Sequence, residues 1–182
     1  MMTILIRDRV NRKIVVHRFV AYFIDMTLLM IAVQSVQWGL FILTDGFPFN
    51  QLALSNSGIL IYGWVFLTVS IPIWLYFILQ ERSVHHATIG KRIMGLVVES
   101  QNGEPANLGQ IISRTVIKLL SWEIFHLTFM FPTPLVNDPS AGFRIGFVVG
   151  YLILILYVLV LIQTPLYQSV HDLIARTVVR KK

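Results

Sequence analysis

The chain has 182 residues, of which 55% are hydrophobic and 13% are charged, and its formal net charge is +6. A soluble domain carries about 25% charged residues, so this chain has too little polar surface to cover a water-facing fold. It contains no cysteine, which excludes disulfide bonds and thiolate chemistry. We therefore predict an integral membrane protein with a single domain over residues 1–182, because this length suits one domain.

The first apolar run follows a basic segment. Residues 1–17 combine Ile, Leu and Val with arginine and lysine, and their periodicity does not decide between an amphipathic segment and a short strand. We expect them to anchor the first span to anionic headgroups. Residues 19–43 form that span, which is long enough for a ~30 Å hydrocarbon core. Because the run has no small-x-small cleavage site, we expect it to remain in the protein rather than act as a signal peptide.

The second predicted span leads into a polar region. Residues 44–57 are turn-rich and contain no basic residue, and residues 58–79 form the span, which we expect Pro72 to kink. In the polar region, the β-branched run at residues 96–99 is followed by Asn102-Gly103, which is a tight-turn signal. We therefore predict a short cytoplasmic β-hairpin between the second and third spans.

The third helix is ambiguous in the sequence. It begins with a capping-box pattern at Asn107 and Gln110, and it carries enough charge that hydropathy alone allows it to lie flat or to cross the membrane. Basic residues concentrate in the N-terminal segment, in the region after the second span and in the tail, which marks all three as cytoplasmic. Four spans place every basic residue except Arg144 on that side, together with both termini. The predicted fold is therefore all-α, a four-helix transmembrane bundle with spans at about 19–43, 58–79, 117–135 and 143–162.

Glycines recur at every fourth position around the start of the last span, at Gly142, Gly146 and Gly150. This spacing lets two helix backbones approach closely. The contact could lie within the chain or between two copies of it, and we favour the first because three other spans are available.

Sequence motifs of standard enzymes are absent. Gly90-Lys91 lacks the preceding glycine and the following hydroxyl residue of a phosphate-binding loop. His85 and His86 have neither a cysteine nor a helical histidine partner that would favour a metal. We therefore expect no enzymatic activity, no metal and no cofactor. Topology accounts for the positive charge, so we expect the lipid bilayer as a partner and no nucleic acid.

Ionisable residues occur inside the predicted spans, where a charge costs at least about 2.5–3.5 kcal/mol. Arg18 and Asp25 share one helix face but lie about 10 Å apart along the axis, so we expect each to pair elsewhere. The predicted pairs are Arg18 with Asp172, and Asp25 with Arg114 or Lys118. The candidates are Asp25, Asp172 and Glu123 as ion- or proton-binding groups, with Arg18, Arg114, Lys118 and His171 as charge partners or gate. The same pairs could equally be static ties within the bundle.

Three segments resemble the RDD family of bacterial multi-pass membrane proteins, which is named for an arginine and two aspartates. They are RFVAYFID, TIGKRIMGLVVESQNGEP with the arginine that follows it, and HDLIARTVV. The resemblance implies that Arg18, Asp25 and Asp172 are the name-giving residues, and that Thr88, Gly90 and Lys91 form the loop motif. Ile89 departs from the glycine or proline that is common after the threonine. The resemblance also implies the bacterial cytoplasmic (inner) membrane as the location, and transport, including cation/proton exchange, as the suggested activity.

Our leading hypothesis is a transport-related protein in which Asp25 binds a proton or a monovalent cation, and Arg18 with Asp172 forms a cytoplasmic-side gate. Four spans are few for a secondary transporter, which usually combines two repeats, so transport would require a homo-oligomer. The alternative is an accessory or scaffold protein whose ion pairs are structural and whose hairpin docks a partner. A third possibility, an enzyme that acts on a lipid headgroup through Lys91 and Arg92, lacks a nucleophile and a base.

Overall fold

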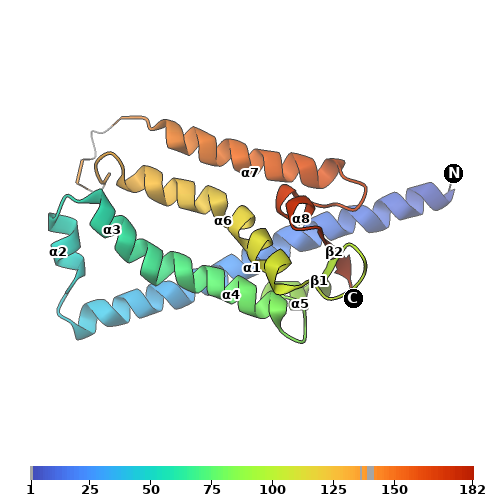
Figure 1. Ribbon diagram of the computed structural model, residues 1–182, viewed down its shortest axis with the longest axis horizontal. Coiled ribbons are helices and arrows are strands. Elements are labelled where there is room, and N and C mark those ends of the chain that lie inside the picture. The colour runs from blue at the N-terminus through green and yellow to red at the C-terminus, as the bar shows by residue number, and fades with distance from the viewer. Residues whose placement is uncertain (1, 136, 139–141) are drawn as a thin grey trace. The chain divides into compact units, whose positions relative to one another are not determined.

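The structure, a computed structural model, describes residues 2–135, 137–138 and 142–182, with side chains described from residue 13 onwards. The chain is mostly helical, with two short strands (Figure 1). The basic segment at the N-terminus is neither a strand nor a separate element, because α1 (Met2–Leu43) runs through it. The arginine side chains predicted to contact headgroups before residue 13 lie outside the described side chains.

Three described helical segments are long and apolar enough to cross a membrane. They are Lys13–Leu43, Gly58–Arg82 and Ile145–Gln163, and they correspond to the predicted spans at 19–43, 58–79 and 143–162. The predicted third span at 117–135 falls on α6 (Leu108–Met130), which has 23 residues. Its last five predicted residues lie beyond the end of that helix.

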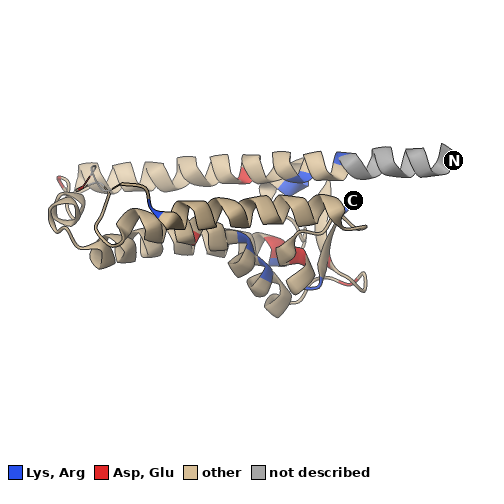
Figure 2. Ribbon diagram, turned by 90° about the horizontal axis from the view of Figure 1, so that it is seen from above, with Lys and Arg blue, Asp and Glu red and all other residues tan. Residues whose placement is uncertain are grey.

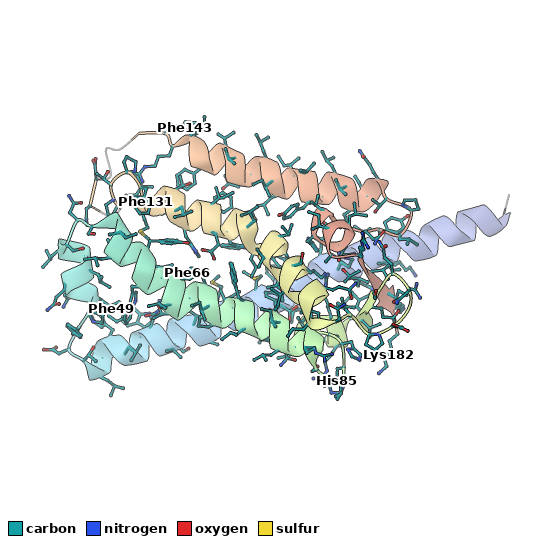
Figure 3. All side chains as sticks on the ribbon, in the orientation of Figure 1. Phe49, Phe66, His85, Phe131, Phe143 and Lys182 are labelled. Carbon is teal, nitrogen blue, oxygen red and sulfur yellow. The ribbon has the colours of Figure 1, made fainter. Side chains whose placement is uncertain are left out.

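The second of these segments is not a uniform α-helix. It consists of α3 (Gly58–Val65), a π-helical turn η1 (Phe66–Ser70) and α4 (Ile71–Arg82). The turn, which begins at Phe66 (Figure 3), ends just before Pro72. Proline has no N–H to donate, and its ring crowds the carbonyl four residues earlier. The regular α-helical hydrogen bonding is therefore interrupted there, and the backbone forms a π-helical turn. The sequence predicted a kink at Pro72, and the structure has a π-helical turn just before that residue.

The chain divides into two compact units, which are described separately here. The first consists of Met1–Leu28, Leu75–Lys118 and Ile155–Lys182, and the second of Leu29–Trp74 and Leu119–Leu154. The boundaries between the units fall within helices. Each of α1, α4, α6 and α7 (Ile145–Gln163) has residues in both units. The first unit also holds two short helices, α5 (Ile89–Ile93) and α8 (Val170–Ile174).

The predicted β-hairpin in the first unit is reduced to one antiparallel bridge, between Glu99 and Pro105, and the main partner of the first strand lies elsewhere. Strand β1 (Leu96–Ser100) pairs antiparallel with β2 (Thr177–Lys181), a strand of the C-terminal tail, and Val98 lies opposite Val179 (Figure 1). The tight turn does form, since the Gly103 amide donates to the carbonyl of Ser100 at 3.0 Å. The chain after the turn cannot supply a long return strand, because a proline at position 105 lacks an amide donor and the cap of α6 follows directly.

The sheet and one residue of α1 form a small apolar core in the first unit. Leu96, Val98 and Val179 are buried against Ala21 of α1. The predicted capping box at the start of α6 is confirmed, because the amide of Asn107 donates to the side chain of Gln110 at 3.0 Å and the amide of Gln110 donates back at 2.9 Å.

In the second unit, α7 packs against α6 through two of the three predicted glycines. A Cβ on Gly146 would overlap the side chain of Thr128, and one on Gly150 would overlap the ring of Phe125. These contacts lie within one chain. Gly142 does not belong to this interface, because it precedes the helix and a Cβ there would meet nothing within 4 Å among the described residues.

The lone basic residue between α6 and α7 has a local role in the second unit. The guanidinium of Arg144 donates to the carbonyl oxygens of Thr128 at 2.7 Å, Phe131 at 2.8 Å and Thr133 at 2.6 Å. Phe131 follows the end of α6 (Figure 3). Carbonyls at the end of a helix lack intrahelical donors and carry partial negative charge, so Arg144 caps α6.

Candidate functional site

Asp172 is the centre of a buried charge network in the first unit. Figure 2 shows where acidic and basic residues lie along the ribbon. The carboxylate of Asp172 accepts hydrogen bonds from the guanidinium of Arg18 and from Nε of Arg114, the latter at 2.8 Å. It also accepts one from the amide of Ser169 at 3.0 Å, which fixes the start of α8. The predicted pairing of Arg18 with Asp172 is therefore present. The carboxylate ties α1, α6 and α8 together.

Glu81, at the end of α4, is the second acidic residue of the network. Its side chain is fully buried, and its Oε1 accepts a hydrogen bond from Nζ of Lys91. Its Oε2 accepts one from Nη1 of Arg114 at 2.8 Å, and Nζ of Lys118 lies 3.6 Å from Oε1. Arg114 and Lys118 thus pair with Glu81, and the predicted pairing of either with Asp25 is wrong.

Asp25 is buried but is held by neutral donors. Its Oδ1 accepts hydrogen bonds from the hydroxyl of Tyr76 at 2.6 Å and the amide of Gly90 at 2.7 Å, and its Oδ2 accepts one from the hydroxyl of Thr88 at 2.5 Å. Two of the three donors come from the start of α5. Asp25 therefore acts as the anchor that holds α5 against α1.

The loop motif of Thr88, Gly90 and Lys91 is explained by this anchor. Thr88 caps α5, with its Oγ1 accepting from the amide of Lys91 at 3.4 Å. A Cβ on Gly90 would overlap the carbonyl oxygen of Ala21, so only glycine allows this close approach of α5 to α1. The side chain of Lys91 is then directed to Glu81.

Electrostatics in the first unit follow from burial and from these pairs. Burial alone would raise the pKa of the Asp172 carboxyl, but Arg114 and Arg18 outweigh it and hold that pKa well below its usual range. Burial, together with repulsion from Arg114, lowers the pKa of Lys91 to about 8, although Glu81 opposes this. Burial also lowers the pKa of His171, whose Nε2 lies 3.7 Å from Asp172, well below its usual value. His171 is therefore neutral at pH 7 and is a neighbour of the network rather than a cation in it.

Glu123 lies in the second unit, on α6, apart from the residues just described. Its side chain is 12% exposed, and its Oε2 accepts a hydrogen bond from the hydroxyl of Tyr62 at 3.2 Å. Nδ1 of His126, one turn further along α6, lies 3.8 Å from the same oxygen and 3.4 Å from the hydroxyl of Ser70. Among the described residues, Glu123 forms no ion pair with a lysine or an arginine.

Sequence reasoning missed Glu81 and understated Lys91. One signal for Glu81 was available, since it directly adjoins an apolar span in a region with an excess of basic residues. The role of Lys91 depends on the tight packing of α5, which sequence spacing does not reveal. In the part of the chain that the structure describes, no three His, Asp or Glu side chains gather where a metal ion could bind.

Comparison with known proteins places the chain in a family. It is 29% identical over 120 residues to an uncharacterized protein, YxaI, of Bacillus subtilis (strain 168), a match that covers 62% of this chain and 80% of the relative. No solved structure matches it significantly. The model of the RDD family matches residues 14–176, which include Arg18, Asp25 and Asp172. With three apolar helices and this match, the protein is a membrane protein that belongs to the RDD family.

Proposed function

We propose that this protein moves protons or monovalent cations across the membrane, and that an intramembrane carboxylate binds the transported ion. The observation that carries the proposal is the environment of Glu123. It is a buried acid on α6 whose partners among the described residues include Tyr62 and His126 but no lysine or arginine. Acidic residues inside spans occur rarely and mark ion and proton paths. Because none of the described lysines and arginines pairs with Glu123, its charge can be balanced by a mobile cation.

Glu123 fits this role better than Asp25, the residue that the sequence favoured. Asp25 is saturated by three hydrogen bonds that hold a neighbouring helix in place, so a change in its charge would disturb the packing of α5. Asp172 is bound by two arginines. Both carboxylates therefore hold elements of the first unit together, whereas the contacts of Glu123 are long and few.

The proposal includes a four-span topology with both termini in the cytoplasm and the bacterial inner membrane as the location. A helix of 23 residues such as α6 extends about 34 Å at 1.5 Å per residue, which is enough for a ~30 Å hydrocarbon core. The capping role of Arg144 accounts for the one basic residue on the other side. Since four spans provide half of the usual transporter, we propose that the active form is a homo-oligomer. The proposal assigns no enzymatic reaction and needs no cofactor.

Proton flux in liposomes tests the proposal. Purified wild-type protein, reconstituted around an entrapped pH-sensitive dye, should change the internal pH when a Na⁺ or K⁺ gradient is applied. The Glu123→Gln variant should reduce this flux to that of empty liposomes. Glu104→Gln, a change at an exposed acidic residue, is the matched control and should leave the flux unchanged. Equal flux from wild type and Glu123→Gln would refute the proposal.

A second candidate function is favoured by the density of the charge network. A carboxylate that joins Arg18 and Arg114 in full burial is well suited to a static scaffold that presents the β1–β2 sheet to a partner. This candidate predicts no ion flux from wild-type protein. It also predicts that changes to the network remove the protein from the membrane, whereas Glu123→Gln has no effect in cells.

A further inference from the structure

Two lysines of the first unit share one carboxylate oxygen. Nζ of Lys91 donates a hydrogen bond to Oε1 of Glu81, and Nζ of Lys118 lies 3.6 Å from the same atom. The other oxygen, Oε2, is taken by Nη1 of Arg114 at 2.8 Å. Both lysines are almost completely buried, with side chains 10% and 9% exposed. The two carboxylate oxygens of Glu81 therefore lie next to three cationic side chains, those of Lys91, Lys118 and Arg114.

Among the described residues, the other buried carboxylates of the unit do not supply the missing partner. Asp172 is engaged by Arg18 and Arg114, and Asp25 is engaged by neutral donors. The closest further contact of Lys118 is the ring of Phe77, whose centroid is 3.3 Å from Nζ. An aromatic face attracts an ammonium, but it does not replace a carboxylate.

A buried ammonium that lacks its own counter-ion is unstable relative to the neutral amine, because burial penalises charge and a like charge nearby adds repulsion. We propose that Lys91 and Lys118 form a proton-binding site around Glu81 in which the two amines share one exchangeable proton. When that proton leaves for water, one ammonium becomes a neutral amine, and the remaining ammonium has Oε1 to itself. The titration belongs to the pair and not to either residue alone.

The surrounding charges determine how readily this proton is released. Arg114 on α6 and Arg18 on α1 are permanent cations and favour release, while Glu81 on α4 and Asp25 on α1 oppose it. Lys91 lies outside the spans. Burial and Arg114 together lower its pKa to about 8, although Glu81 opposes the shift. The site is distinct from Glu123, which belongs to the other unit, and the inference does not depend on the proposed transport function.

Nitrogen NMR of protein labelled with ¹⁵N-lysine, in lipid nanodiscs, tests the inference. As pH rises, one wild-type lysine signal should change from ammonium to amine at least about one pH unit before those of the exposed Lys181 and Lys182. Loss of the signal in Lys91→Met would assign it. The same early change should persist in Glu123→Gln, which separates this result from the outcome of the transport assay.

A matched pair of variants tests the sharing itself. In Lys118→Met one source of repulsion is removed while burial and Arg114 remain, so Lys91 should titrate at a higher pH than in wild type but still before the exposed lysines. In Lys118→Arg a guanidinium that cannot be deprotonated keeps the repulsion, so the midpoint of the titration should not rise. A midpoint that is unchanged in Lys118→Met, one that rises equally in both variants, or an early change that is missing from wild type would overturn the inference.

Discussion

Substitution of Asp172 by Asn gives the most direct measure of what the charge network contributes to stability. The carboxylate is fully buried, and the two guanidinium groups that it joins, those of Arg18 and Arg114, have side chains only 9% and 1% exposed. Removal of one partner of a buried pair costs about 3–5 kcal/mol, because it leaves an unpaired charge out of water. Asn leaves Arg18 without its carboxylate, whereas Arg114 keeps its pair with Glu81 at 2.8 Å, so we expect the free energy of unfolding to fall by an amount within this range.

The assay is unfolding by sodium dodecyl sulfate in mixed micelles, followed by tryptophan fluorescence. Glu99→Gln is the matched control, because Glu99 pairs with Arg180 at 3.6 Å and their side chains are 28% and 51% exposed. Exposed pairs contribute about 0–1 kcal/mol, so the control should unfold almost as wild type does. If Asp172→Asn stayed within about 1 kcal/mol of wild type, the network would not be a structural element and the reasoning would be wrong.

Three further predictions use the same measurement. Gly90→Ala should cost about 1–3 kcal/mol because its Cβ meets a carbonyl of α1, whereas Gly63→Ala, with nothing within 4 Å among the described residues, should be neutral or stabilising by up to about 1 kcal/mol. Gly146→Ala should destabilise the contact between α6 and α7, and Gly142→Ala should not. Because the pKa of His171 is lowered in the folded protein, the unfolded chain binds a proton at this residue below about pH 6.5 and the folded chain does not. The free energy of unfolding should therefore decrease as pH falls below that value, and His171→Gln should abolish this part of the decrease.

The helices could be predicted well because their signal is local. Three apolar runs gave spans within a few residues of the observed segments, and the polar pair of Asn107 and Gln110 located the start of α6. The pairing of Arg18 with Asp172 could also be predicted, because both were charges near the ends of predicted spans with few alternatives. Each of these predictions depended either on residues that are close in sequence or on the small number of charged residues available for pairing.

The errors came from contacts between distant segments. Nothing local distinguishes a strand that pairs with its neighbour from one that pairs with the tail, so β1 was given the wrong partner. Asp25 was expected to need a cation, but backbone and hydroxyl donors from α5 satisfy it instead. That solution depends on a glycine that lets the two backbones meet, which a charge count does not detect. Arg114 and Lys118, which the sequence analysis paired with Asp25, lie next to Glu81 instead.

The central claim is that Glu123, and not the buried Asp25, is the carboxylate that exchanges a proton within the membrane. Infrared difference spectroscopy of the protein in lipid, recorded across a pH titration, measures this directly through the carbonyl band of a protonated carboxyl group. We predict a pH-dependent band in wild-type protein that is lost in Glu123→Gln and retained in Asp25→Asn. A band that survives in Glu123→Gln, or that disappears in Asp25→Asn, would contradict the claim.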